Sequence, residues 1–111
     1  MRINKKIIPI QGIKLFIKKD GEEIARAFLY ILKNDIRGKK FGYLEDVFVD
    51  ENFRDQGIGT KLLKKVIIEA KKNNCYKIVA TSRKGKKKVH AFYEKMGFKN
   101  FGIEFKMYLE N

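Results

Sequence analysis

The sequence has few of the residues that stabilise small proteins through covalent bonds or metal ions. Among its 111 residues there is one cysteine, Cys75, and one histidine, His90. One cysteine excludes an internal disulfide, and the two residues together are too few for a zinc site made by protein ligands alone. We therefore expect no metal cofactor, with Cys75 as a small core residue and His90 as a surface or packing residue.

Long apolar runs and proline-rich linkers are also missing. The longest apolar runs, such as residues 27–32, are far too short to cross a bilayer, and the first residues contain no apolar signal core. Pro9 is the only proline, and the chain contains no repeat or low-complexity segment. These features predict a single domain over residues 1–111, soluble and cytoplasmic, with no membrane partner.

Acidic residues are few: the chain has 13 of them and 26 basic residues, which gives a formal net charge of +13. A polycation can bind nucleic acid by releasing the counterions of the phosphate backbone. Of the basic residues, however, 21 are lysines spread over most segments, whereas proteins that read a DNA groove use arginine forks on one element. Attraction of small anions is therefore favoured, and nucleic-acid binding is kept as the weaker alternative.

The periodicity of apolar residues predicts an α/β (α+β) domain with a mixed sheet and the order β-β-β-α-β-α-β. The expected strands cover residues 13–17, 23–32, 41–49, 76–81 and 101–109, and the expected helices cover 58–74 and 87–96. Asp20-Gly21 is typical of a hairpin turn, and Gly97 of a left-handed helix end. Because the first helix makes the crossover, the buried strand 76–81 should run parallel to strand 41–49.

Residues 54–59, Arg-Asp-Gln-Gly-Ile-Gly, join strand 41–49 to the first helix. Two glycines at such a turn let the backbone approach a ligand, and the free N–H groups of the helix start favour phosphate. A dinucleotide fingerprint would need glycine in place of Leu62, and no Gly-Lys-Ser/Thr sequence occurs. The turn thus predicts another kind of phosphate site, unless its glycines serve only the turn itself.

Together with a later segment, this turn resembles the GCN5-related N-acetyltransferase (GNAT) superfamily. In that superfamily an Arg/Gln-x-x-Gly-x-Gly/Ala turn binds the pyrophosphate of acetyl-CoA. The second signature, an aromatic-Tyr-x-x-x-Gly-Phe segment on a helix, is present as residues 92–98. The resemblance covers roughly residues 13–109, and residues 44–49 and 75–78 look most like glucosamine-6-phosphate N-acetyltransferases.

The resemblance implies a set of residues that bind the acetyl donor, acetyl-CoA. They are Val47, Phe48, Val49, Arg54, Asp55, Gln56, Gly57, Ile58, Gly59 and Thr60. The turn amides would hold the pyrophosphate, and Arg54 would add positive charge. The backbone of residues 47–49 would pair with the pantetheine arm and polarise the thioester carbonyl, while their side chains pack in the core.

The resemblance also implies catalytic roles in direct attack of a free amine on acetyl-CoA within a ternary complex. Tyr93 would protonate the departing thiolate, and the alternative is a tyrosine that only packs in the core. Glu45 would act on the amine, directly or through water, and the alternative is a solvated surface charge. Since successive strand residues alternate, Glu45 and Asp46 should point to opposite faces, so at most one faces the acetyl group.

The acceptor amine is less well defined. GNAT proteins usually begin with a strand and two helices that cover the acceptor, and only about a dozen residues precede the first expected strand here. This favours a bulky acceptor such as a protein or peptide amine, unless a homodimer partner supplies the missing wall, and an amino sugar phosphate stays open. Many members also carry asparagine where this chain has Lys86.

Five basic residues precede the second helix, namely Arg83, Lys84, Lys86, Lys87 and Lys88. Positive charge is unfavourable at a helix N-terminus. The run is either solvated or binds an anion: the 3′-phosphate of CoA, an acidic acceptor or nucleic acid. Two functions other than catalysis also remain, a non-catalytic acetyl-CoA-binding module and a basic nucleic-acid-binding domain.

Overall fold

The computed structural model describes residues 1–110, which form two compact units. The first is Met1–Ala80 and the second begins at Thr81, and each is described by itself. The prediction of a single domain stays a prediction. The elements in chain order are β1 (Gln11–Lys19), β2 (Glu22–Leu32), β3 (Lys40–Val49), the 3₁₀ helix η1 (Glu51–Phe53), α1 (Ile58–Lys72), β4 (Cys75–Ala80) and α2 (Lys87–Lys95).

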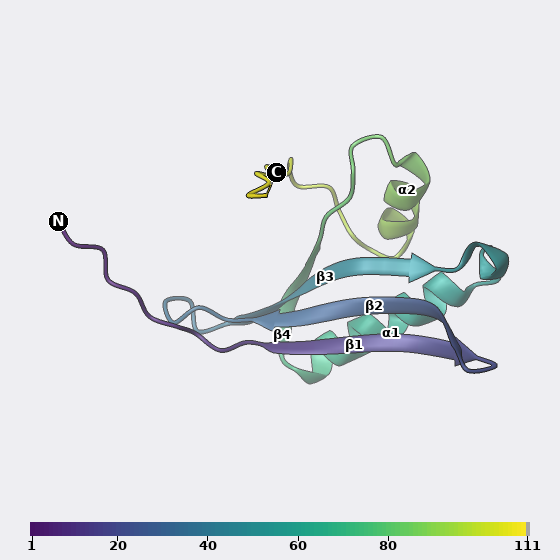
Figure 1. Ribbon diagram of the computed structural model, residues 1–111, viewed down its shortest axis with the longest axis horizontal. Helices are drawn as coiled ribbons and strands as arrows, with labels where there is room; N and C mark the ends of the chain where they lie inside the picture. Colours follow the sequence, from purple (N-terminus) through teal and green to yellow (C-terminus); the bar gives the residue numbers. More distant parts are fainter. Residues whose placement is uncertain (111) are drawn as a thin grey trace. The chain divides into compact units, whose positions relative to one another are not determined.

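The first unit contains a four-stranded mixed sheet in the order β1-β2-β3-β4 (Figure 1). Strands β1, β2 and β3 are antiparallel neighbours, and β4 runs parallel to β3 after the crossover through α1, as predicted. The turn between β1 and β2 has Asp20 at φ 52° and Gly21 at φ 81°. Positive φ at both residues matches the right-handed twist of a hairpin, which confirms the predicted turn.

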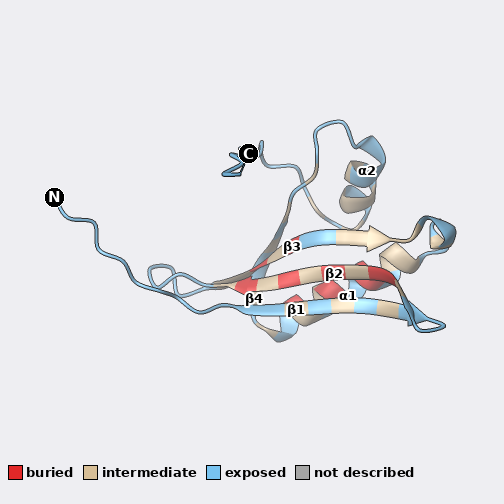
Figure 2. Cartoon of the chain, viewed as in Figure 1, coloured by how far each residue is buried: buried red, intermediate tan, exposed pale blue. Residues whose placement is uncertain are grey.

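The core lies between α1 and one face of the sheet, and β2 is its most buried strand (Figure 2). Alternate β2 residues and one stripe of α1 supply most of the buried side chains: Ala25, Ala27, Leu29, Ile31, Leu62, Leu63, Val66 and Ala70. A strand repeat of two and a helix repeat of 3.6 place these residues on facing surfaces. Each fully buried leucine or valine stabilises the fold by about 1.5–3 kcal/mol.

The end of α1 falls where the sequence predicts it. The backbone N–H and the side-chain amide of Asn73 both donate to the Glu69 carbonyl, the latter at 2.8 Å. Asn74 then adopts φ 60°, a left-handed conformation that asparagine tolerates. Lys71 and Lys72 in the last turn face the negative end of the helix dipole, which favours this end point.

Two strand predictions are wrong. Strand β4 is not buried: it is an edge strand paired only with β3, and Tyr76 is 58% exposed. Residues 101–110 form no strand, and Phe101 and Phe105 are 92% and 89% exposed. Alternation of apolar residues specifies a face but not a neighbour, and a strand needs a neighbour for its backbone hydrogen bonds.

Among residues 1–110 no helix is both long and apolar enough to span a bilayer. The same residues contain no group of three or more histidine, cysteine, aspartate or glutamate side chains placed to hold a metal ion. Cys75 is a half-buried free thiol at the start of β4, and burial raises its pKa against the opposing charge of Lys40. A raised pKa keeps this thiol protonated and unreactive at neutral pH.

Candidate functional site

The predicted phosphate turn is ordered by its own hydrogen bonds. The Asp50 carboxylate accepts the N–H of Asn52 at 2.9 Å, and the Asp50 N–H donates to the Ile24 carbonyl of β2 at 2.8 Å. Asp55 at φ 62° and Gly57 at φ 79° then redirect the chain into α1. The turn therefore enters the helix in a fixed direction, joined to the end of the sheet.

The N-terminus of α1 has amide groups available to a ligand. Gly57 is the N-cap, no side chain caps the helix, and its first turn carries no acidic residue. The first helical hydrogen bond runs from Lys61 N–H to the Gly57 carbonyl at 3.0 Å, so the amides of residues 58–60 precede it. A Cβ built at Gly57 would meet no heavy atom within 4 Å. Free amides, the positive helix end and open space together fit a phosphate group.

The side chains of the turn hold it closed and remain at the surface. Arg54 Nε donates to the Val49 carbonyl at 2.9 Å, and Gln56 Nε2 donates to the Asn52 carbonyl at 3.4 Å. Arg54, Asp55 and Gln56 are all exposed. The Arg54 side chain therefore lies beside the helix start and also fixes the end of β3, a second role that the sequence pattern did not indicate.

Strand β3 has a backbone edge that β4 leaves unpaired next to this turn. The pairing of β3 with β4 ends at Leu44 and Ala80, whereas β3 continues to Val49. Residues 45–49 therefore have no β4 partner, and the side chains of residues 47–49 are half-buried. An extended ligand can pair with such an edge as an added strand would. The residues predicted to bind pantetheine through their backbone lie on this segment.

A β-bulge at Asp46 overturns the prediction that Glu45 and Asp46 point to opposite faces. The β2–β3 register shifts by one residue between the pairs Arg26–Phe48 and Phe28–Glu45, and Asp46 has φ 51°. The extra residue breaks the alternation. The Asp46 carboxylate consequently reaches Arg26, which lies on the same face as Glu45. Two successive acidic residues inside an apolar strand were the available signal of this bulge.

The two carboxylates at the bulge have different surroundings. Asp46 lies 3.4 Å from Arg26 Nε, and the same guanidinium lies 3.6 Å from Glu23 and 4.6 Å from the centre of the Phe48 ring. Glu45 is exposed, and no hydrogen bond or ion pair joins its carboxylate to another side chain or to the backbone in the described part of the chain. Of the two carboxylates, Glu45 is therefore the one whose oxygens are not engaged by a cationic side chain.

In the second unit, Tyr93 lies on α2 with a half-buried side chain. Its ring centre is 5.9 Å from that of Phe92 and 5.3 Å from that of Phe98, and Gly97 ends the helix at φ 102° as predicted. Burial raises the pKa of the Tyr93 phenol. The phenol consequently stays protonated at neutral pH, as a general acid must. The packing role and the acid role are compatible.

The basic run at residues 83–88 is exposed and extends into the first turn of α2, which has no acidic residue. The ion pairs among residues 1–110 do not include this run. His90 Nε2 donates to the Arg83 carbonyl at 2.8 Å, so His90 fixes the loop against its own helix. This hydrogen bond agrees with the expectation of a surface or packing residue at His90, whereas anion binding by the run stays a prediction.

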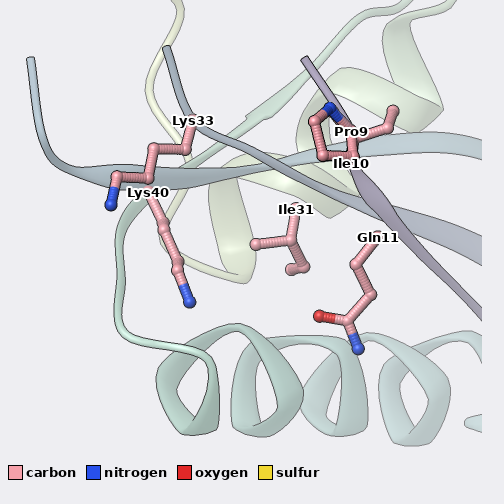
Figure 3. A pocket seen from close by; sticks show the side chains of 6 residues that line it. All are labelled: Pro9, Ile10, Gln11, Ile31, Lys33 and Lys40. Atoms are coloured by element: carbon pink, nitrogen blue, oxygen red, sulfur yellow. The ribbon is translucent and has the colours of Figure 1, made fainter. Parts of the chain in front are cut away.

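A separate shallow pocket lies at the other end of the sheet (Figure 3). Its volume is about 270 Å³, and the lining residues are Pro9, Ile10, Gln11, Ile31, Lys33 and Lys40. Lys40 begins β3, whereas the phosphate turn follows the last residue of β3, Val49. The pocket contains none of the predicted site residues.

A model of the Acetyltransferase (GNAT) family matches residues 8–98, a range that includes the turn, the bulge and the Tyr93 helix. The match covers more than half of the chain. The protein therefore belongs to the GNAT family, and the resemblance inferred from the two motifs is confirmed.

Individual relatives of the chain are named N-acetyltransferases. It is 30% identical over 86 residues to a probable glucosamine 6-phosphate N-acetyltransferase 2 of Oryza sativa, covering 77% of this chain and 50% of that protein. It is 33% identical over 96 residues to human N-alpha-acetyltransferase 30, covering 85% and 26%.

A solved structure agrees with the family membership. The crystal structure of glucosamine-6-phosphate N-acetyltransferase from Arabidopsis thaliana superimposes with a TM-score of 0.79 at 29% identity, covering 89% of this chain and 67% of that one. The chain spans about half the length of the curated glucosamine 6-phosphate N-acetyltransferases that it matches.

Proposed function

We propose that this protein transfers an acetyl group from acetyl-CoA to a primary amine by direct attack within a ternary complex. One observation carries the proposal. An uncapped helix start at residues 58–60 follows, after residues 50–57, a strand whose segment 45–49 has no β4 partner, in a chain of the GNAT family. The first feature suits a pyrophosphate, and the second suits an extended amide-containing arm.

The proposed donor site uses mostly backbone groups. The amides of residues 56–60 bind the pyrophosphate, with Arg54 adding positive charge at the turn. Residues 47–49 pair with the pantetheine arm, and one of their N–H groups donates to the thioester carbonyl oxygen as negative charge develops there. Asp55 contributes its backbone conformation rather than its carboxylate, since a negative side chain would oppose a phosphate.

The chemical step forms a C–N bond and breaks the C–S bond of the thioester. Glu45, directly or through water, accepts the proton that the amine loses. Tyr93 donates a proton to the departing thiolate. A phenol is a weaker acid than a thiol, so this transfer depends on position and occurs as charge develops on sulfur.

The acceptor is proposed to be an amine that loses its proton readily. Freeing an α-amine at pH 7 costs about 1 kcal/mol, whereas freeing a lysine amine costs about 4.6 kcal/mol. A single exposed carboxylate, Glu45, is better suited to deprotonating an α-amine, which has the smaller cost. Relatives are named glucosamine 6-phosphate N-acetyltransferase and N-alpha-acetyltransferase, so an amino sugar phosphate and an α-amine are both candidate acceptors here.

Thermal unfolding with and without acetyl-CoA tests the donor site. Ligand at about one hundred times its Kd should stabilise the folded state by about 2.7 kcal/mol and raise Tm. No shift at millimolar acetyl-CoA would refute the proposal. A shift produced equally by short duplex DNA, and abolished by salt, would instead support the nucleic-acid alternative.

Thiol release from acetyl-CoA tests catalysis with glucosamine 6-phosphate, a peptide with a free N-terminus and the same peptide with only a lysine amine. Release with either of the first two acceptors, above that with the lysine peptide, is the expected result. A thermal shift without thiol release from any acceptor would identify a non-catalytic acetyl-CoA-binding module.

A further inference from the structure

Helix α1 packs on one face of the four-stranded sheet (Figure 1), and aromatic side chains gather on the opposite face, here called the outer face. In β2 the buried residues 27, 29 and 31 belong to the core, so the half-buried residues that alternate with them lie on the outer face. The same holds in β3 for the two neighbours of the buried Gly42. These positions on the outer face are all aromatic: Phe28, Tyr30, Phe41 and Tyr43.

Strand register brings the four rings together. Tyr30 of β2 is directly opposite Tyr43 of β3. Phe28 lies two residues before Tyr30, and their ring centres are 6.4 Å apart with planes 10° from parallel. Phe41 lies two residues before Tyr43 on the same face of β3. The four rings are therefore neighbours on adjacent strands.

The edge strand β4 adds a fifth ring and positive charge. Lys77 Nζ lies 5.2 Å from the ring centre of Phe41 and 5.2 Å from that of Tyr76, and Lys39 Nζ lies 5.5 Å from the Tyr76 ring. Both lysines are exposed, and the ion pairs among residues 1–110 include neither of them. The five rings, here called the aromatic cluster, thus lie beside two lysines that no carboxylate neutralises.

The carboxylates of the outer face lie toward the β-bulge. Glu45 is directly opposite Phe28, and Glu23 and Asp46 both lie close to the guanidinium of Arg26. The β4 side of the aromatic cluster is therefore its more positive side.

Rings interleaved with unpaired lysines suit a single-stranded nucleic acid. A base stacks on an aromatic ring more strongly than an exposed ammonium binds the same ring. A base can therefore displace Lys77 or Lys39 from its ring, and the displaced ammonium is then available to a neighbouring phosphate. Aromatic rings and lysines bind a single strand without reading its sequence, so the arginine forks of groove-reading proteins are not required.

A duplex suits this surface less well, because its bases stack on one another and cannot lie on side-chain rings. Among single strands, the two facing tyrosines favour RNA. The hydroxyls of Tyr30 and Tyr43 form no hydrogen bond within residues 1–110, and no buried side-chain polar atom of these residues lacks a partner, so both hydroxyls reach the surface. A phenol can donate to or accept from the 2′-hydroxyl, which DNA lacks.

We propose that the outer face of this protein binds single-stranded RNA, with bases stacked on the aromatic cluster and phosphates at Lys39 and Lys77. A four-stranded sheet of this kind accommodates two or three stacked bases. The activity is separate from acetyl transfer, because the aromatic cluster contains none of the residues proposed to bind acetyl-CoA or to catalyse the reaction.

Fluorescence anisotropy with the whole protein and a labelled oligouridylate of about ten nucleotides tests the proposal. The expected result is a lower Kd for this RNA than for three matched polyanions. They are oligodeoxyuridylate, the same RNA in a duplex with oligoadenylate, and a polyglutamate peptide of equal charge. Tyr43→Phe should reduce the preference for oligouridylate over oligodeoxyuridylate, because it removes one hydroxyl and keeps the ring.

Two pairs of variants separate stacking from charge. Tyr76→Leu should raise the Kd of oligouridylate about tenfold, whereas Tyr76→Phe, which keeps the ring, should leave it nearly unchanged. Lys77→Gln should reduce the slope of log Kd against log salt concentration by about 0.7, because one phosphate contact is lost. Lys64→Gln makes the same charge change on α1, which packs on the other face of the sheet, and should leave the slope unchanged.

Four results would overturn the proposal. They are no binding of oligouridylate at low salt, equal Kd values for the RNA and any of the three matched polyanions, equal Kd values in Tyr76→Leu and Tyr76→Phe, or equal salt slopes in Lys77→Gln and Lys64→Gln. The rise in Tm with acetyl-CoA should be the same in all four variants, which verifies that each is folded and keeps a failure of RNA binding distinct from a failure of the donor site.

Discussion

Tyr93 packs against the rings of Phe92 and Phe98, and its hydroxyl is the proposed general acid. The two roles can be separated at this single residue. Tyr93→Phe keeps the ring and its packing against Phe92 and Phe98 but removes the acid. We expect turnover to fall about 10²-fold with little change in the Kd of CoA. Tyr76→Phe, at an exposed tyrosine of β4, is the matched control. Unchanged turnover in Tyr93→Phe would remove the acid role.

The pH dependence of turnover follows from the same side chain. Because burial raises the pKa of Tyr93 above its ordinary value of 10.0, the phenol stays protonated below that pH. Loss of turnover through Tyr93 ionisation should therefore begin only above about pH 10. The free energy of unfolding also falls as pH rises from about 10 toward the pKa of the folded state, because the phenol of the unfolded chain ionises first. A fall in turnover near pH 8 that is absent in Tyr93→Phe would contradict the raised pKa of Tyr93.

Arg26 forms an ion pair with Asp46 at the β-bulge and none with the neighbouring Glu45. Arg26→Met removes the contacts to Asp46 and Glu23 but retains an unbranched side chain over Phe48. Since these groups are partly exposed, the loss of stability should be only about 0.5–1 kcal/mol. Turnover should fall further than stability predicts, because residues 45–49 are no longer held in position.

Arg37→Met, at an exposed arginine of the loop before β3, is the control for the lost charge. Urea unfolding and turnover measured on both variants check the prediction. Equal turnover in Arg26→Met and Arg37→Met would show that the bulge does not depend on Arg26.

At the scale of an element, the start of α1 depends on the backbone of Gly57. Gly57 and Gly21 have nearly equal positive φ values, 79° and 81°, and a Cβ at either would meet no heavy atom within 4 Å. Alanine at each position should therefore cost the same stability, about 1 kcal/mol of backbone strain. Only Gly57→Ala should also weaken acetyl-CoA binding, by about tenfold, because its Cβ and shifted backbone disturb the free amides.

Calorimetric titration of the two variants measures this difference. Equal Kd values for acetyl-CoA in Gly57→Ala and Gly21→Ala would mean that the helix start does not hold the pyrophosphate.

Elements with a strong periodic pattern could be predicted from the sequence. The apolar residues of α1 recur at helical spacing and those of β2 alternate, so both elements could be predicted, and Asn73-Asn74 indicated the end of the helix. The exposure of β4 and the absence of a strand over residues 101–109 could not be predicted, because both depend on which neighbour is present rather than on the segment itself. The bulge at Asp46 depends likewise on the register with β2.

At the scale of the whole molecule, the net charge of +13 should assist the binding of an anionic donor. Raising the salt concentration from about 0.05 M to 0.5 M should raise the Kd of CoA several-fold, since the Debye length shortens to a few ångströms. If the basic run binds the 3′-phosphate, Lys86→Gln/Lys87→Gln should weaken CoA but not dephospho-CoA, which lacks that group. Equal weakening of both ligands would assign these lysines to general attraction only.

The sequence by itself determined the order of the elements up to α2, the glycine turn at residues 54–59 and the GNAT family, because periodicity, glycine spacing and motif order are local properties of a chain. Only the tertiary structure decided which groups are available for chemistry. It joined Asp46 to Arg26 and left Glu45 free, ended β4 before residues 45–49, and left the apolar row at residues 101–109 exposed. These outcomes depend on strand register and strand neighbours, which are fixed by contacts between segments distant in sequence.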